Sequence, residues 1–296
     1  MAKRFLMIGM IAALVLNEIQ VYAQYNKPLR HFMQAVPSPA SAIPYGNNPS
    51  AGHYVQVGDA KIYYEVYGKG KPSVVLHGGI FGSTYEMKQF IDSLSKNYLV
   101  IAISTRGHGK SEIGSELITY ELKANDVLAV IQTVTKDSVA ILGFSDGAYT
   151  AYKLASMYPD KVKKLIAIGA GEFYHGGPRT FNFKAQEIIR ADSSYWTQQL
   201  ALMPEPKRFQ EFLTKMADFY NQLQVGKELF FTIKCPVLVM AGEKDQNAPM
   251  PTIIDAYHMI PKSQLSIIPN VSHPAFLDNF PAVWASIVPF LKHYSR

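Results

Sequence analysis

The chain has 296 residues, a formal net charge of +6 and one cysteine. The positive charge is spread along the chain without a long Lys/Arg block, which argues against a nucleic-acid partner. A single cysteine excludes an internal disulfide, and Cys235 begins an apolar run, so we expect a buried thiol rather than a nucleophile. Because neither a C-x-x-C nor an H-E-x-x-H spacing is present, we predict no metal site.

The first 23 residues have the pattern of a cleavable secretory signal. Lys3 and Arg4 precede an uncharged, mostly apolar run over residues 5–16, and Ala23 provides a small residue for cleavage. The apolar run is short of the roughly 20 residues that span a bilayer, so cleavage after Ala23 is favoured over a stable membrane anchor. We therefore predict a secreted or periplasmic protein.

Residues 24–52 are rich in proline, with Ser, Ala, Gly and Asn between the prolines. They show neither a helical nor a strand periodicity, and such segments pack poorly. We predict a linker that buries little. The remaining part, about 240 residues, is long enough for one large domain with an insertion.

Beyond residue 53 the sequence predicts strands and helices that alternate after an antiparallel start. The expected strands cover residues 54–57, 61–67, 73–76, 98–103, 138–142, 162–168, 236–240 and 265–268. The expected helices cover residues 84–95, 119–135, 148–155, 251–259 and 281–293. Such alternation is typical of an α/β fold with a mostly parallel central sheet flanked by helices.

The alternation is interrupted between residues 171 and 231, where aromatic residues are frequent and no core strand is predicted. We predict a helical cap over residues 172–231, inserted into a core formed by residues 53–171 and 232–296. Most of its aromatic side chains should pack the cap, while a few, with Trp196 as the candidate, should line an apolar substrate pocket.

The most informative motif is Gly143-Phe144-Ser145-Asp146-Gly147, between a predicted strand and a predicted helix. A serine at this place occupies a very tight turn, and glycine two positions before and after it relieves the crowding. This is the G-x-S-x-G pattern of a nucleophile elbow, which makes Ser145 the candidate nucleophile. We expect Asp146 to offer its backbone N–H to the substrate and its side chain to cap the helix.

A serine nucleophile requires a base and an acid, which follow it in the order Asp or Glu, then His. Asp245 and His273 each lie on a loop just past a predicted strand. Because the carboxyl ends of parallel strands lie along one edge of a sheet, we predict that both meet Ser145. Glu243 is the alternative acid, although Asp245 lies further into the loop.

An acyl-transfer site also needs two N–H donors for the oxyanion. Asp146 is the first candidate because it follows the serine, and the second should come from the glycine-rich loop over residues 77–83. Gly79 is the preferred donor there and Ile80 the alternative. His77 and His108 are interpreted as structural histidines of the loops, with His108 close to the cleft as a further option.

Together these segments resemble the α/β-hydrolase superfamily, in its branch of small capped serine hydrolases. The resemblance extends over about residues 54–293 and is carried by residues 77–79, 104–111, 143–147, 242–245 and 272–274. It implies a Ser-Asp-His triad that uses neither a metal nor an organic cofactor. Ser104 departs from the aspartate usual in that family, which should weaken a loop contact. A serine nucleophile argues against the haloalkane dehalogenase and epoxide hydrolase branches, where it is aspartate.

We therefore expect a serine hydrolase that cleaves an ester or related acyl bond of a small, partly apolar substrate through an acyl-enzyme on Ser145. A lactonase, an aminopeptidase or a carbon–carbon bond hydrolase could use the same triad, since a fold does not choose among them. A ligand receptor with slow turnover is the alternative from another class.

Overall fold

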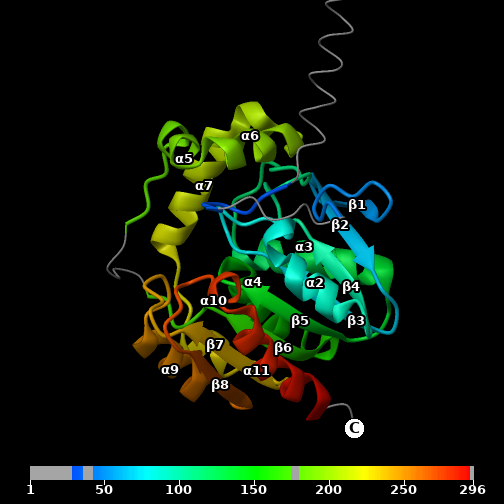
Figure 1. Cartoon of the computed structure of the whole chain (residues 1–296), viewed down its shortest axis with the longest axis vertical. Coiled ribbons are helices and arrows are strands. Elements are labelled where there is room, and N and C mark those ends of the chain that lie inside the picture. Colours follow the sequence, from blue (N-terminus) through cyan, green and yellow to red (C-terminus); the bar gives the residue numbers. More distant parts are fainter. Residues whose placement is uncertain (1–28, 36–42, 175–179, 294–296) are drawn as a thin grey trace, which may run out of the picture.

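The computed structural model describes residues 29–35, 43–174 and 180–293 (Figure 1). The predicted signal peptide and its cleavage after Ala23 lie outside the described residues. Among the helices of the described part, none is long and apolar enough to cross a membrane.

Eight strands form one sheet in the order β1-β2-β4-β3-β5-β6-β7-β8. They are β1 (Gly52–Val57), β2 (Ala60–Tyr67), β3 (Lys71–Leu76), β4 (Tyr98–Ile103), β5 (Val139–Phe144), β6 (Val162–Ile168), β7 (Val237–Gly242) and β8 (Ser263–Ile268). The pairs β1/β2 and β2/β4 are antiparallel, and all later neighbours are parallel. The predicted α/β fold with a mostly parallel sheet is confirmed.

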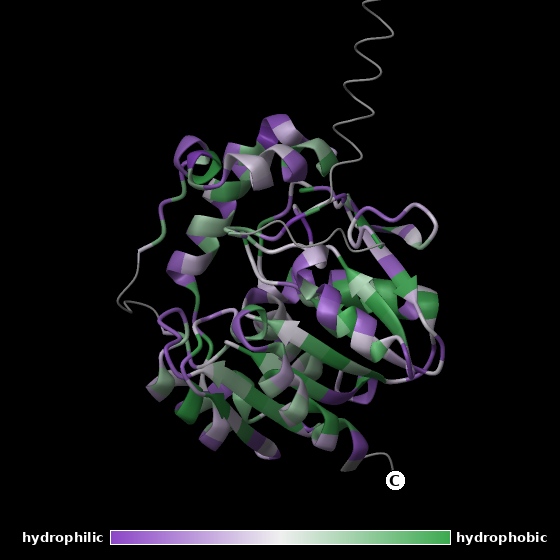
Figure 2. Ribbon diagram, in the orientation of Figure 1, coloured by the Kyte–Doolittle hydropathy of each residue, from purple (hydrophilic) through white to green (hydrophobic). Residues whose placement is uncertain are grey.

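Helices cover both faces of the sheet (Figure 1). One face packs against α3 (Tyr120–Val134), α4 (Asp146–Met157) and α9 (Met250–Met259). The other packs against the 3-10 turn η1 (Thr84–Met87), α2 (Lys88–Leu94), α10 (Ala275–Asp278) and α11 (Phe280–His293). Alternate strand residues enter opposite cores, since successive side chains of a strand point to opposite faces. Figure 2 accordingly shows hydrophobic residues concentrated along the strands.

The cap lies between β6 and β7. It contains α5 (Ala185–Ala191), α6 (Ser193–Leu202), the short turn η3 (Pro206–Arg208) and α7 (Phe209–Gln222), which stand together on one side of the core in Figure 1. These helices share a hydrophobic cluster, to which the main domain contributes Ile80, Ile113 and Ile118. The next helix, α8 (Lys227–Phe230), packs against α4 and α9 of the main domain instead.

Part of the proline-rich segment packs onto the domain, so the prediction that residues 24–52 bury little is wrong for that part. Tyr45 is 1% exposed, and its hydroxyl donates a hydrogen bond to Asp92. The backbone N–H groups of Gly46 and Asn48 donate to the buried Glu65 carboxylate, each at 2.8 Å. A segment without regular structure can thus be ordered when one carboxylate satisfies its backbone donors.

Replacement of Tyr45 tests how far this segment contributes to the fold. Tyr45→Ala should lower the free energy of unfolding by about 3–5 kcal/mol, as expected for truncation of a buried aromatic side chain. Tyr54 on β1, which is 53% exposed, is the control, and Tyr54→Ala should cost less than about 1 kcal/mol. Urea denaturation measures both. Equal losses in the two variants would refute the structural role of Tyr45.

Candidate active site

Ser145 occupies a strained turn between β5 and α4. Its backbone has φ 50° and ψ −117°, a conformation that residues with a side chain rarely adopt. A Cβ on Gly143 would lie 2.6 Å from the carbonyl oxygen of Gly147, and one on Gly147 would lie 2.5 Å from that of His77. Both positions therefore require glycine, as the motif predicted.

The structure brings the predicted nucleophile, base and acid together. The His273 Nε2 atom is 2.9 Å from the Ser145 Oγ atom, and His273 Nδ1 is 2.8 Å from an oxygen of Asp245. The other oxygen of Asp245 also accepts the backbone N–H groups of Asn247 and Ala248, each at 2.8 Å. Because a carboxylate only accepts, Nδ1 carries the proton and the Nε2 lone pair faces the serine hydroxyl.

The alternative acid lies away from this chain of hydrogen bonds. Glu243 is exposed, and its carboxylate accepts the backbone N–H of Asn270 at 2.8 Å. Asp245, by contrast, has a side chain only 1% exposed, directly against His273. The geometry favours Asp245 over Glu243 as the partner of the histidine.

The two loop histidines are buried and lie outside the chain of hydrogen bonds that joins Asp245, His273 and Ser145. His77 Nε2 accepts the backbone N–H of Thr105 at 3.1 Å, and burial lowers the pKa of His77 to about 4. The ring of His108 packs edge-on against that of Phe212 in α7, with the ring centroids 5.2 Å apart. Burial lowers the pKa of His108 as well. Neutral, packed rings of this kind support the loops and the cap, in agreement with their structural interpretation.

The loop after β3 borders the site beside the serine. Gly79 and Ile80 both line the cavity that contains Ser145, whereas the N–H of Gly78 is occupied by a hydrogen bond to Glu86 at 2.9 Å. A Cβ on Gly79 would lie 2.1 Å from the hydroxyl oxygen of Tyr220 in α7. Gly79 and Ile80 therefore both remain available as oxyanion donors together with Asp146, which is the first residue of α4.

The Asp146 side chain does not cap the helix, so that expectation was wrong. A capping side chain belongs to the residue before the helix, and Asp146 is already its first residue. Its carboxylate instead forms a buried ion pair with Lys123 and accepts the hydroxyl groups of Tyr120 at 3.2 Å and Tyr220 at 3.1 Å. Since Tyr220 belongs to α7, this carboxylate joins the cap to the elbow.

The sequence contains a signal for this buried ion pair outside the catalytic motifs. Lys123 lies between Tyr120 and Val127 on the apolar face of α3, where an unpaired lysine would be costly. A lysine at such a place predicts a buried acidic partner, although the sequence alone does not identify Asp146.

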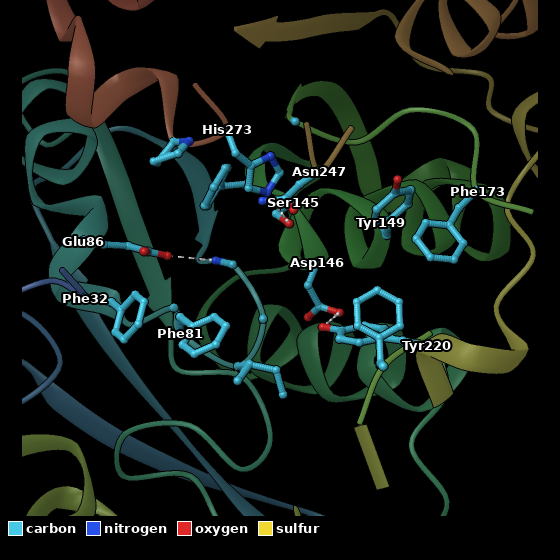
Figure 3. Close-up of a pocket in the computed structure, with 18 of the residues that line it drawn as sticks. Phe32, Phe81, Glu86, Ser145, Asp146, Tyr149, Phe173, Tyr220, Asn247 and His273 are labelled. Carbon is cyan, nitrogen blue, oxygen red and sulfur yellow. Dashed lines mark hydrogen bonds between the residues drawn. The ribbon is translucent and has the colours of Figure 1, made fainter. Parts of the chain in front are cut away.

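Ser145 and His273 lie in the wall of a cavity of about 430 Å³ (Figure 3). Aromatic rings dominate the lining. The cap and its connections contribute Phe173, Phe181, Phe183 and Tyr220, and other segments contribute Phe32, Phe81, Tyr120, Phe144 and Tyr149. The predicted apolar pocket is therefore present in the structure.

Trp196 is not among the residues that line this cavity, so its selection as a pocket residue was wrong. The residue is 3% exposed, and its ring packs against that of Phe209 inside the cap, with the ring centroids 4.7 Å apart. The indole lies on the face of α6 that closes the cap's own core.

Cys235 is 8% exposed, and burial raises the pKa of its thiol to about 11. This agrees with its interpretation as a buried apolar residue. Within the described residues, no group of three or more His, Cys, Asp or Glu side chains is arranged to hold a metal ion.

Comparison with known proteins assigns the chain to a family. The model of the family described as alpha/beta hydrolase fold matches residues 72–224. This match covers more than half of the chain, and the protein belongs to the alpha/beta hydrolase fold family. The resemblance inferred from the motifs is thereby confirmed.

Relatives known by sequence extend over most of the chain. The AB hydrolase superfamily protein YisY of Bacillus subtilis is 26% identical over 265 residues, which are 81% of this chain and 98% of that protein. The human serine hydrolase BPHL is 26% identical over 263 residues, 83% of this chain and 88% of that one. These relationships support a hydrolase.

Solved structures show the same fold at lower identity. The meta-cleavage product hydrolase of Pseudomonas fluorescens IP01 has a TM-score of 0.70 and 18% identity, over 82% of this chain and 98% of that one. The enol-lactonase of Burkholderia xenovorans LB400 has a TM-score of 0.66 and 19% identity, over 81% of this chain and 99% of that one.

The buried ion pair beneath the elbow leads to a prediction about stability. Lys123→Met should lower the free energy of unfolding by about 3–5 kcal/mol, because it leaves the Asp146 carboxylate buried without a cation. Adding Asp146→Asn should recover much of that loss. The control is Lys153→Met, whose partner Glu121 is 54% exposed, with an expected loss below about 1 kcal/mol. Chemical denaturation would contradict the ion-pair argument if both lysine variants lost the same amount.

Proposed function

We propose that the protein is a serine hydrolase that cleaves an ester or related acyl bond of a small, partly apolar substrate through an acyl-enzyme on Ser145. The observation that carries this proposal is the continuous chain of hydrogen bonds from Asp245 through His273 to the Ser145 hydroxyl. The chain ends in the wall of an apolar cavity large enough for a small ester.

In the proposed mechanism, the Ser145 oxygen attacks the substrate carbonyl while His273 Nε2 takes its proton. The Asp245 carboxylate stabilises the resulting imidazolium and keeps the ring oriented. The backbone N–H groups of Asp146 and Gly79 bind the oxyanion. His273 then protonates the leaving alcohol, and a water that passes its proton to the same ring releases the acid and regenerates the serine.

An ester is preferred over the alternatives because its alcohol leaves more readily than the amine of a peptide or the carbon of a carbon–carbon bond. A lactone is a cyclic ester and demands the same chemistry. An enol-lactonase and a meta-cleavage product hydrolase share this fold, which keeps the lactonase and carbon–carbon hydrolase alternatives open. Steady turnover of p-nitrophenyl acetate would favour an enzyme, and a single burst without turnover would favour a receptor.

The first prediction of this mechanism concerns the nucleophile. Ser145→Ala should reduce hydrolysis of p-nitrophenyl acetate by about 10⁴-fold or more, with unchanged thermal stability, because it removes only the attacking oxygen. A fluorophosphonate probe should label the wild type once, on Ser145. The exposed Ser194 on α6 is the control, and Ser194→Ala should keep full activity and labelling. Labelling at another serine would exclude the proposed nucleophile.

A second prediction separates the two carboxylates past β7. Asp245→Asn should lower kcat by about 10⁴-fold, because the amide no longer stabilises the imidazolium or selects its tautomer. Glu243→Gln should leave kcat within about twofold, since the exposed Glu243 carboxylate accepts the backbone N–H of Asn270 and is not bonded to His273. Steady-state kinetics of both variants measure the two kcat values. A large loss in Glu243→Gln with little loss in Asp245→Asn would assign the acid to Glu243.

The third prediction concerns the length of the acyl chain. For neutral p-nitrophenyl esters, kcat/KM should rise by up to about fourfold for each added CH₂, the equivalent of about 0.8 kcal/mol, until the cavity is full, and then fall. Phe181→Ala enlarges the cavity and should move the optimum to longer chains. Phe231→Ala, at a ring 47% exposed and outside the cavity, should not. A flat profile for the wild type would show that the cap rings do not hold the acyl chain.

A further inference from the structure

Glu86 lines the same cavity as Ser145, and the proposed mechanism does not use it. It belongs to η1, just after the loop that borders the oxyanion site, and it is 6% exposed. One carboxylate oxygen accepts the N–H of Gly78 at 2.9 Å (Figure 3). This hydrogen bond fixes the carboxyl group at the edge of the cavity as an acceptor.

Within the part of the chain that the structure describes, Glu86 forms no ion pair. Among the described residues, neither a lysine nor an arginine lines the cavity, and its other acidic residue, Asp146, is already paired with Lys123. Burial consequently raises the pKa of Glu86 to about 8, although the N–H groups of Gly78 and Ser83 act in the opposite direction. A carboxylate that is buried, held by donors and without a cation is suited to a cationic ligand.

Tyr195, the titratable neighbour that the cap places near Glu86, does not supply a positive charge. The hydroxyl of Tyr195 in α6 donates to the carbonyl oxygen of Phe81 at 2.9 Å, and burial raises the pKa of Tyr195 well above its ordinary value. Tyr195 is therefore a neutral phenol committed to the loop, and it offers no positive charge to Glu86.

Two phenylalanine rings complete the surroundings. Phe32 and Phe81 stack with their ring centroids 4.4 Å apart, and both line the cavity. Figure 3 draws them on the same side of the cavity as Glu86. The faces of aromatic rings attract cations, most strongly where water is excluded. The ring of Phe32 is brought there by residues 29–35, which Arg30 anchors to Asp192 of the cap at 3.1 Å.

We propose that Glu86, Phe32 and Phe81 form a subsite for an ammonium group, so that the preferred substrates are small esters that carry a cationic amine. The ammonium group would donate hydrogen bonds to the carboxylate and lie against the rings, while the ester carbonyl reaches Ser145. The choice of ester substrates rests on the proposed function, whereas binding of the ammonium group itself does not.

Binding is tested with a pair of ligands that undergo no reaction. 2-Phenylethylammonium and 2-phenylethanol have the same apolar part and differ in charge. Calorimetry with the Ser145→Ala variant at about pH 8.5, where a carboxyl of pKa about 8 and an alkylammonium are both mainly charged, compares their Kd values. We expect the ammonium ligand to bind at least about tenfold more tightly. Equal affinity, or a preference for the alcohol, would overturn the subsite.

Variants then locate the preference. Glu86→Gln keeps the size of the side chain and an acceptor for the Gly78 N–H, and it should abolish the ammonium preference. The ratio of two Kd values within one variant cancels any general distortion of the loop. Phe81→Leu removes an aromatic face and should reduce the ratio, which provides a second test if Glu86→Gln does not fold. Glu243 is a carboxylate outside the cavity, and Glu243→Gln should leave the ratio of the two Kd values unchanged. A ratio retained in both Glu86→Gln and Phe81→Leu would refute the assignment.

Turnover tests the substrate class separately. In the wild type, p-nitrophenyl 6-aminohexanoate should have a kcat/KM at least about tenfold higher than p-nitrophenyl heptanoate, in which a methyl group replaces the ammonium. If neither ester nor p-nitrophenyl acetate turns over while the ammonium ligand still binds preferentially, the proposed function fails and the subsite stands. If both esters turn over equally, the function stands and the ammonium substrate class is overturned.

Discussion

The tight turn at Ser145 is the constraint on which the site depends. A side chain at φ 50° costs of order 1–3 kcal/mol, and the surrounding structure must hold it there. The Ser145 N–H is bonded to the carbonyl oxygen of Ile168 in β6 at 2.8 Å, and glycines at positions 143 and 147 let neighbouring backbone approach closely. The same turn that aims the hydroxyl at His273 also begins α4, so the site and the packing of the sheet are set together.

The residue that follows the serine links three parts of the molecule. Asp146 is the first residue of α4, its ion pair with Lys123 ties it to α3, and its hydrogen bond to Tyr220 ties it to α7 of the cap. The close approach of Tyr220 to Gly79 adds the loop after β3. A movement of α7 that displaced Tyr220 would break its hydrogen bond to Asp146 directly beside the nucleophile, so the position of the cap and the shape of the oxyanion site are coupled.

Features governed by short-range patterns could be predicted from the sequence. The parallel sheet follows from apolar runs, and the position of Ser145, Asp245 and His273 follows from loops at strand ends. Glu86 and Tyr220 were missed because their roles depend on which distant surfaces the fold brings together. Trp196 was misplaced for the same reason, since composition shows that a cap is aromatic without showing which rings face inward.

The packing of residues 29–35 has a consequence for how this protein can diversify. Phe32 forms part of the cavity wall, yet it lies upstream of the first strand and is joined to the cap through Arg30 and Asp192. The part of the wall that Phe32 contributes thus lies outside the sheet and is free of the constraints on its strands. Changes in a short N-terminal stretch would therefore alter which molecules fit without touching the strands that position Ser145, Asp245 and His273.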